Sequence, residues 1–326
     1  MSQQRVCRAL QESGDYLSGQ ELSRTLGISR AAVWKAVEAL RRQGYDIEAR
    51  TGRGYRLIGA PDFLSRETVE QYLHRTRENL HVLETVDSTN SFCRRLALEG
   101  APDGTAVLAD CQTAGRGRRG RSFQSPAGLG LYGSVLLRSR PEDAPRIPAL
   151  AATAVRRAIR RSCGLSCGIK WPNDLVLSGR KVCGILAEAL PGPEGSLWVV
   201  VGIGINVCQR REDFLPELRE TAASLSMIAG AEIDRAALET AFLEELEALR
   251  RELPQETAER RQEYGVACLN LGHRVRVLRP GGEREALAVS LTPDYGLAVR
   301  YDDGTEEVLR SGEVSVRGLY GYTDKE

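Results

Sequence analysis

The chain has 326 residues, of which 42% are hydrophobic and 27% are charged. This length accommodates two or three packed domains, and the composition is too polar for a membrane protein. No apolar run approaches the roughly 20 residues of a transmembrane helix, and the first ten residues lack the apolar core of a signal peptide. We therefore expect a cytoplasmic protein with no membrane partner, in which the eight cysteines are reduced.

The net charge of +1 is unevenly distributed. Residues 1–60 contain ten Lys and Arg against six Asp and Glu, a net charge of +4, whereas the remainder carries −3. Because a basic region attracts polyanions, the N-terminal end is the candidate for a nucleic-acid partner.

The same end carries the pattern of a helix-turn-helix. Leu22 and Leu26 fall on one face of a short helix, and Gly27 stands where a tight turn needs a positive φ. Ser29 is expected to cap a second helix. Two short strands at 45–49 and 55–58 then predict a hairpin wing with a basic tip.

A winged helix of this kind places its second helix in the major groove and its wing beside phosphate or the minor groove. The predicted DNA-binding residues are Ser29, Arg30, Lys35 and Arg53. A small helical domain that binds protein is the alternative, and the basic wing favours DNA.

After a linker-like segment at 59–62, strand and helix patterns alternate. Strands are predicted at 80–86, 105–110 and 129–137, on both sides of a Ser178–Gly179 turn, and at 196–207, and helices are predicted at 87–100, 147–162 and within 232–262. From Gly272 onward, short strands separated by Gly and Asp turns are typical of a small β-barrel.

The segment "GRGRRGR" at 115–121 holds four arginines and three glycines. Backbone N–H groups of a Gly-rich loop and forked guanidinium groups both bind phosphate or carboxylate oxygens. A Walker A motif is excluded because no GxxxxGK[ST] occurs. A disordered Arg/Gly tail is disfavoured because a clear strand pattern follows.

Three further patches have the polarity of a binding site: "DSTN" at 87–90, "KWPNDL" with "GRKVCGIL" within 170–186, and "GIGIN" at 202–206. Each is weak alone. Asp87 and Ser88 could serve only as a helix cap, and Gly202 and Gly204 could mark only a bulge.

Together and in this order, the motifs resemble the biotin protein ligase family, in its bifunctional bacterial type that also acts as the biotin operon repressor. The resemblance covers nearly the whole chain and implies an α+β fold. Its parts would be a winged helix-turn-helix at 1–60, a mixed-sheet catalytic domain like that of class II aminoacyl-tRNA synthetases at 64–268, and an SH3-like β-barrel at 270–322. One departure is Phe123, where the family usually has Trp.

The resemblance implies an enzyme that joins biotin to ATP, with Mg²⁺ as activator, and passes biotin to a lysine of the biotin carboxyl carrier protein of acetyl-CoA carboxylase. Lys181, Arg116 and Arg118 would be catalytic. The implied biotin-binding residues are Ser88, Thr89, Asn90, Gln112, Arg116, Gly117, Arg118, Lys181, Gly202 and Gly204. The implied ATP-binding residues are Arg119, Arg121, Phe123, Lys170, Asn173, Asp174 and Asn206. No dedicated metal ligand is implied, and Asp174 would have an orienting or metal-bridging role.

The other implied partners are operator DNA and a second copy of the chain when the adenylate is bound, with biotin as the precursor of the co-repressor. Two alternatives stay open: a ligand-sensing repressor without turnover, and a lipoate ligase on a related fold. Intact Lys181, Arg116 and Arg118 favour an enzyme. The arginine loop, "KWPNDL" and the winged helix favour biotin over lipoate.

Overall fold

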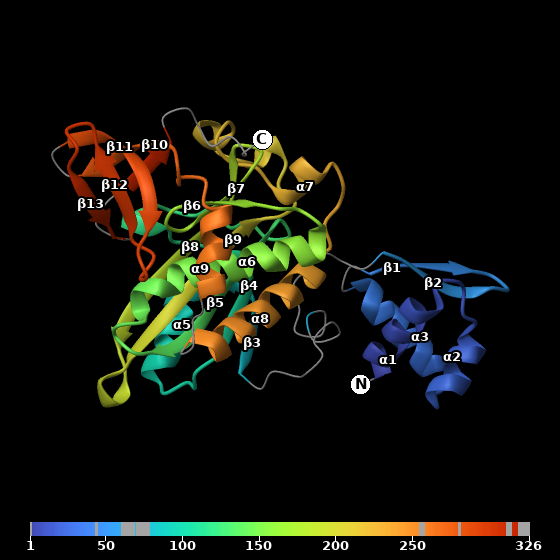
Figure 1. Ribbon diagram of the computed structural model, residues 1–326. Helices are drawn as coiled ribbons and strands as arrows, with labels where there is room; N and C mark the ends of the chain where they lie inside the picture. Colours follow the sequence, from blue (N-terminus) through green and yellow to red (C-terminus); the bar gives the residue numbers. More distant parts are fainter. Residues whose placement is uncertain are drawn as a thin grey trace. The chain divides into compact units, whose positions relative to one another are not determined.

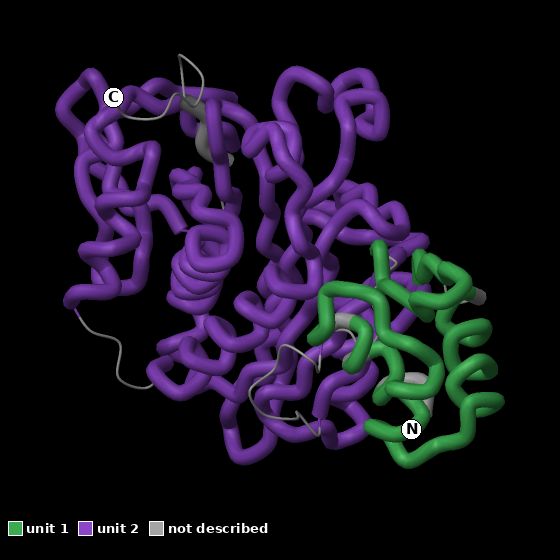
Figure 2. The backbone as a smooth tube through the Cα atoms, turned by 90° about the vertical axis from the view of Figure 1, so that its right-hand side faces the viewer, with its two compact units in different colours: residues 1–63 green, residues 64–326 purple. Residues whose placement is uncertain are grey.

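The computed structural model describes residues 2–42, 45–59, 69, 79–253, 258–279, 282–310 and 315–318. The chain divides into two compact units, Met1–Phe63 and Leu64–Glu326 (Figure 2). Most of the predicted linker, the predicted start of the catalytic domain at 64 and the predicted end of the last domain at 322 lie outside the described residues. All eight cysteines are free.

The first unit is a winged helix-turn-helix (Figure 1). Its elements are α1 (Ser2–Ser13), α2 (Gly19–Leu26), α3 (Arg30–Arg42), β1 (Asp46–Arg50) and β2 (Gly54–Gly59). Gly27 ends α2 in the left-handed conformation at φ 64°, and Ser29 Oγ accepts a hydrogen bond of 3.1 Å from the Ala32 N–H. The predicted turn and cap are therefore confirmed. Helix α1 was not predicted, and its Val6 and Leu10 complete the core against Val37.

The second unit is built on a seven-stranded mixed sheet with the order β3-β4-β5-β9-β8-β7-β6. These strands are β3 (Leu80–Val86), β4 (Ala106–Gln112), β5 (Gly130–Ser139), β6 (Gly168–Lys170), β7 (Asp174–Leu177), β8 (Arg180–Pro191) and β9 (Leu197–Asn206). β3 and β4 run parallel, and the other neighbours are antiparallel. The turn between β7 and β8 is the predicted one, since Ser178 and Gly179 both have positive φ.

Helices cover both faces of this sheet. They are α5 (Thr89–Leu98), α6 (Ile147–Cys163), α7 (Leu225–Ala229), α8 (Arg235–Glu252) and α9 (Ala258–Ala267). Because side chains alternate along a strand, neighbours separate onto the two faces. Leu136 and Val200 pack with Cys93 of α5, whereas Val135 and Val201 join the larger core of α6 and α8, which lie side by side in Figure 1. No helix in the described ranges is long and apolar enough to span a membrane.

The C-terminal strands form a second, five-stranded antiparallel sheet with the order β13-β12-β11-β10-β14. They are β10 (Arg274–Arg279), β11 (Gly282–Leu291), β12 (Leu297–Tyr301), β13 (Glu306–Leu309) and β14 (Ser315–Gly318). Trp171, just after β6, connects the two sheets. Its Nε1 donates to the Tyr295 carbonyl at 2.8 Å, and its N–H donates to Asn270 Oδ1 at 2.7 Å.

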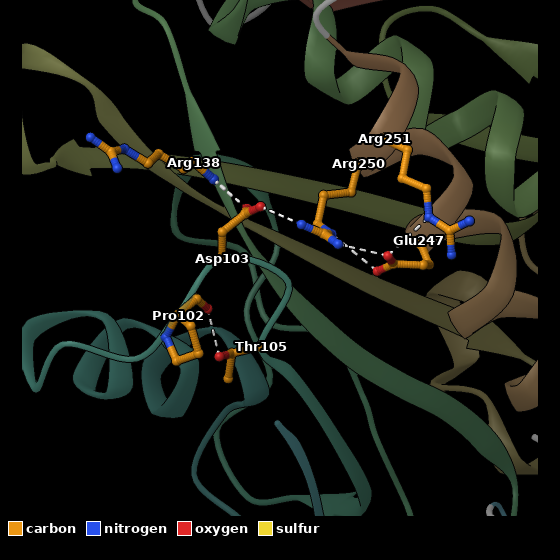
Figure 3. A network of polar contacts seen from close by, with 7 residues as sticks. All are labelled: Pro102, Asp103, Thr105, Arg138, Glu247, Arg250 and Arg251. Carbon is orange, nitrogen blue, oxygen red and sulfur yellow. Dashed lines mark hydrogen bonds and ion pairs between the residues drawn. The ribbon is translucent and has the colours of Figure 1, made fainter. Parts of the chain in front are cut away.

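The C-terminal end of α8 is fixed to the sheet by a polar network (Figure 3). Arg250 donates to Asp103 Oδ2 at 2.7 Å and to both oxygens of Glu247 at 2.7 and 3.0 Å. Asp103 also accepts from the Arg138 N–H at 2.8 Å. This arginine is thus saturated with protein carboxylates.

Candidate active site

The predicted site residues gather on the face of the central sheet that carries α5. Gly202 and Gly204 of β9 lie on this face, in regular register with β5, which excludes a bulge. A Cβ on Gly202 would lie 1.9 Å from Asn90 Oδ1, and a Cβ on Gly204 would lie 2.5 Å from the Phe123 ring. The two glycines therefore make room for other site side chains. The space above them is filled by the side chains of Asn90 and Phe123.

The first turn of α5 forms the buried polar end of the site. Ser88 is its N-cap, and Thr89 and Asn90 are 3% and 4% exposed. The Thr89 N–H donates to Gln112 Oε1 at 2.8 Å. Ser134 Oγ lies 2.8 Å from Thr89 Oγ1 and 2.7 Å from Asn90 Oδ1. The first turn of α5 thus gathers amide and hydroxyl groups into one buried cluster whose members hydrogen-bond to one another.

The base of the arginine loop closes on the same polar group. Gln112 Nε2 donates to Ser125 Oγ at 2.7 Å, and the Gln112 N–H donates to the Ser125 carbonyl at 3.0 Å. Gly115 is buried here, where a Cβ would lie 2.3 Å from the Phe123 carbonyl. The glycine is therefore required by close approach of the chain.

Two arginines of the loop reach residues of the sheet. Arg116 pairs with Glu188 Oε1 at 3.3 Å, and the other oxygen of Glu188 accepts from Asn90 Nδ2 at 2.9 Å. Arg118 Nη1 donates to the neutral amide of Asn173 at 2.8 Å. Burial lowers the pKa of Arg118 from its ordinary value, and the nearby Asp174 opposes that shift. The loop thus brings cations toward the polar cluster without saturating them with carboxylates.

A cavity of about 230 Å³ lies beside Arg118. It is lined by Arg118, Arg119, Pro148, Asn173, Ile185, Leu186 and Ala187. Arg119 has a left-handed backbone at φ 58°, which is uncommon for a residue with a side chain and typical of functional loops.

Lys181, at the start of β8, adds an ammonium group to the guanidinium groups of the loop arginines. Its Nζ pairs with Asp174 Oδ1 at 2.8 Å, and a Cβ on Gly184 would lie 3.0 Å from that Nζ. The Lys181 N–H donates to the Thr221 carbonyl, and the Ala223 N–H donates to the Lys181 carbonyl. These two bonds fix the start of β8 to residues 221–223. The Lys181 side chain remains 39% exposed.

The remaining predicted residues contribute less to the cluster. Asn206 is buried, and its amide lies 3.3 Å from the Ala223 carbonyl and 3.4 Å from Gln209. Phe123 packs edge-on against Tyr132, with the centroids 6.4 Å apart. Arg121 is exposed, and Lys170 is half-buried at the end of β6. Gly117 bonds through its N–H to the Arg121 carbonyl at 2.7 Å and so shapes the loop.

Sequence reasoning missed Glu188, Ser125 and Ser134. Glu188 bridges Arg116 and Asn90, although it stands in an apolar strand pattern. Two of these residues could have been found from the sequence, because a polar residue in a buried strand needs a partner. Glu188 is a carboxylate within the strand pattern "GILAEAL", and Ser134 is a hydroxyl within "LYGSVLL".

The first unit presents its predicted DNA-binding residues to solvent. Arg30 and Lys35 are exposed on α3, and Arg53 lies in the wing, with its guanidinium 4.6 Å from the centre of the Tyr16 ring. Ser29 serves as the cap of α3. Trp34, 55% exposed on the same helix, was not predicted.

The fold and the site define an enzyme for anionic ligands joined to a DNA-binding unit. Residues 82–206 match the biotin/lipoate A/B protein ligase family, and residues 3–56 match a helix-turn-helix domain. The bifunctional ligase/repressor BirA of Bacillus subtilis is 42% identical over 230 residues, which cover 69% of this chain and 71% of that protein. BirA of Escherichia coli is 31% identical over 317 residues, 95% of each chain. The chain therefore belongs to the family of bifunctional biotin ligases and repressors.

The solved structures agree with this membership. The biotin protein ligase of Aquifex aeolicus, in complex with biotin and ATP, is 32% identical, with a TM-score of 0.63 over 74% of this chain and 100% of that one. Together with the BirA relatives and the matched family models, this neighbour confirms the family resemblance of the sequence.

Proposed function

We propose that the chain is an ATP-dependent biotin protein ligase that forms biotinyl-5'-AMP, transfers biotin to a lysine of a biotin carboxyl carrier protein, and represses transcription in response to biotin. The observations that support the proposal are two sets of contacts. Arg116 pairs with Glu188, which also binds Asn90 of the buried polar cluster, and Arg118 and Lys181 contact the neighbouring residues Asn173 and Asp174. Thr89, Asn90 and Gln112 would bind the neutral ureido ring of biotin, with Ser88 fixing the helix that carries two of them.

In the first step a biotin carboxylate oxygen attacks the α-phosphorus of ATP, a new O–P bond forms, and pyrophosphate leaves. Because both reactants are anions, the enzyme needs fixed cations more than a nucleophile of its own. Arg116 and Arg118 would hold the carboxylate and the adenylate, and Lys181 would stabilise the charge on the phosphoryl oxygens. In the second step the carrier lysine amine attacks the acyl carbon, and AMP leaves.

The ATP side rests on Asn173 and Asp174, which already contact Arg118 and Lys181. Arg119, Arg121 and Lys170 would face phosphates, and Phe123 and Asn206 would lie near the adenosine. Mg²⁺ would neutralise charge on the phosphate oxygens and would be held largely by them. No cluster of three metal-ligating side chains occurs in the part of the chain that the structure describes. Asp174, whose Oδ1 pairs with Lys181, is the carboxylate to which the proposal gives an orienting or metal-bridging role.

Two finer assignments belong to the same proposal. The C-terminal strands within 270–322 would close into an SH3-like barrel, and the catalytic sheet at 64–268 would share the class II aminoacyl-tRNA synthetase architecture. The anchoring of Trp171 by Asn270 and Tyr295 supports a C-terminal domain that steadies the neighbouring Asn173.

Repression would use residues 1–60 on operator DNA. One winged helix makes few base contacts, so specific binding requires two copies on a palindrome, and hence a dimer. If the adenylate promotes the dimer, ligand and DNA binding are coupled reciprocally. We expect biotinyl-AMP to strengthen an operator footprint more than biotin does. Arg30→Ala and Lys35→Ala should abolish the footprint and leave biotin transfer intact, and equal occupancy with and without the adenylate would refute the switch.

The ligase function is tested by pyrophosphate release from ATP in the presence of biotin or lipoate. The proposal predicts release with biotin, followed by biotin on the carrier lysine. Release with lipoate alone would select the lipoate ligase alternative. Binding of biotin and DNA with no release at all would select a repressor without turnover.

A further inference from the structure

A buried ion pair lies outside the residues assigned so far. Arg235, the first residue of α8, is 3% exposed, and Asp110, near the end of β4, is 6% exposed. Arg235 Nη2 lies 2.6 Å from Asp110 Oδ1. Ion pairs taken fully out of water gain little stability over apolar packing, so burial of this one calls for another reason.

The pair joins the two ends of the connection that carries the arginine loop. Asp110 accepts from the Gly128 N–H, with its two oxygens at 3.1 and 3.2 Å. Arg235 Nε donates to the Gly130 carbonyl at 3.1 Å. Residues 111–129 thus leave and re-enter the sheet at one charged junction, where Asp110 and Arg235 bond to Gly128 and Gly130 at the far end of this connection.

The junction lies next to the predicted biotin pocket. Gln112 follows Asp110 by two residues and Ser125 precedes Gly128 by three, and these two side chains bond to each other at 2.7 Å. A shift of the junction would therefore move Gln112 Oε1 away from Thr89, which it reaches at 2.8 Å.

We propose that Asp110 and Arg235 are positioning residues for the biotin pocket: the ion pair fixes the base of residues 111–129 so that Gln112 and Ser125 meet Thr89 in binding geometry. This inference rests on the proposed function. Neither side chain belongs to the cluster that would touch biotin, and both act through the backbone that they clamp.

The other end of α8 offers a matched control. Arg250 and Asp103 form an ion pair at 2.7 Å between the same helix and the residues just before the same strand, β4. Their side chains are about one-third exposed, whereas Arg235 and Asp110 are buried. That pair lies at the opposite end of β4 from the loop. Variants of Arg250 and Asp103 therefore measure how the loss of an ion pair of α8 affects stability when the base of the loop is unchanged.

The experiment compares Asp110→Asn and Arg235→Lys with Asp103→Asn and Arg250→Lys in the full chain. Asparagine keeps an oxygen for the Gly128 N–H, and lysine keeps the charge but loses the planar fork. Steady-state kinetics with biotin and ATP are measured well below each variant's melting temperature. We expect the first pair to raise the KM for biotin by about tenfold to a hundredfold, with a smaller change in kcat at saturating biotin, since a displacement near 1 Å has effects of this size.

The control pair should lower the melting temperature and leave the KM for biotin within about twofold of the wild type. Amide hydrogen exchange adds a second measurement, because residues 113–127 should exchange faster in Asp110→Asn than in Asp103→Asn. An unchanged KM for biotin in folded Asp110→Asn protein would overturn the inference, as would an equal rise in Asp103→Asn. A wild-type chain that forms no adenylate would instead refute the proposed function.

Discussion

Arg118 and Arg250 carry the same guanidinium group in opposite surroundings. Arg250 donates to two carboxylates, one of them through both oxygens, and Figure 3 shows it enclosed by them. Arg118 borders a cavity and donates to a neutral amide. An arginine saturated with protein carboxylates stabilises the fold, whereas one held by an amide keeps its charge available for an anion. The comparison supports the proposal that the ligand's charge lies at the arginine loop.

The largest effect is expected from Lys181→Ala. One cation opposite developing charge is worth a few kcal/mol, so adenylate formation should fall by about 10²-fold to 10³-fold. The fold should persist, since the Lys181 side chain is 39% exposed. Single-turnover formation of the adenylate measures the effect, and a variant that reacts at the wild-type rate would remove Lys181 from the mechanism.

Arg118→Ala and Arg250→Ala test the comparison directly. Arg118→Ala should lower kcat/KM for adenylate formation by about tenfold to a hundredfold, with little loss of stability. Arg250→Ala should lower the free energy of unfolding by ~1 kcal/mol, a value discounted for the partial exposure of the pair, and leave the kinetics unchanged. Chemical denaturation and steady-state kinetics on both proteins separate the two outcomes. A kinetic defect in Arg250→Ala would break the distinction.

A smaller and local effect is expected in the arginine loop. Four arginines within residues 115–121 repel one another without an anion. Amide hydrogen exchange there should therefore slow by about tenfold or more when biotinyl-AMP binds, whereas the helix around Arg250 should exchange at the same rate in both states. Equal protection of the loop with and without the adenylate would contradict the role given to its charge.

The smallest effect concerns the exposed pair next to the site. Arg95 binds both oxygens of Asp87, at 2.9 and 3.0 Å, and this hydrogen bonding lowers the pKa of Asp87 to about 2. Because the folded pKa is below the unfolded value of roughly 4, the stabilisation is complete above about pH 5 and is lost as the pH falls toward 2. Both side chains are about half exposed, so Asp87→Asn should cost less than ~1 kcal/mol at pH 7. Denaturation at pH 7 and pH 2.5 should show that difference shrinking with acid.

Local patterns predicted the fold well at positions where the backbone conformation or a helix cap requires a particular type of residue. Gly27 at a left-handed helix end and Ser29 at a cap are examples, and so is the Ser178–Gly179 turn. Helix α1 was missed because its start was considered only as a signal peptide, although Val6 and Leu10 have helical spacing.

The sequence predicted the motifs of the candidate site, but it did not predict the contacts between those motifs. Glu188 meets Asn90 from 98 positions away, and Arg235 meets Asp110 from 125 positions away. Such pairs depend on sheet order and strand register, which no local pattern specifies. The contact at Gly204 is of the same kind, because the space that this glycine opens is occupied by the Phe123 ring.

The central claim is that Arg116, Arg118 and Lys181 surround a site where biotin and ATP become an adenylate. Incubation of the chain with biotin and ATP labelled at the α-phosphate, followed by gel filtration, tests it most directly. The account predicts biotin-dependent retention of label on the protein, with release of the label as AMP when carrier protein is added. Label that stays in free ATP, in the presence of biotin and Mg²⁺, would contradict it.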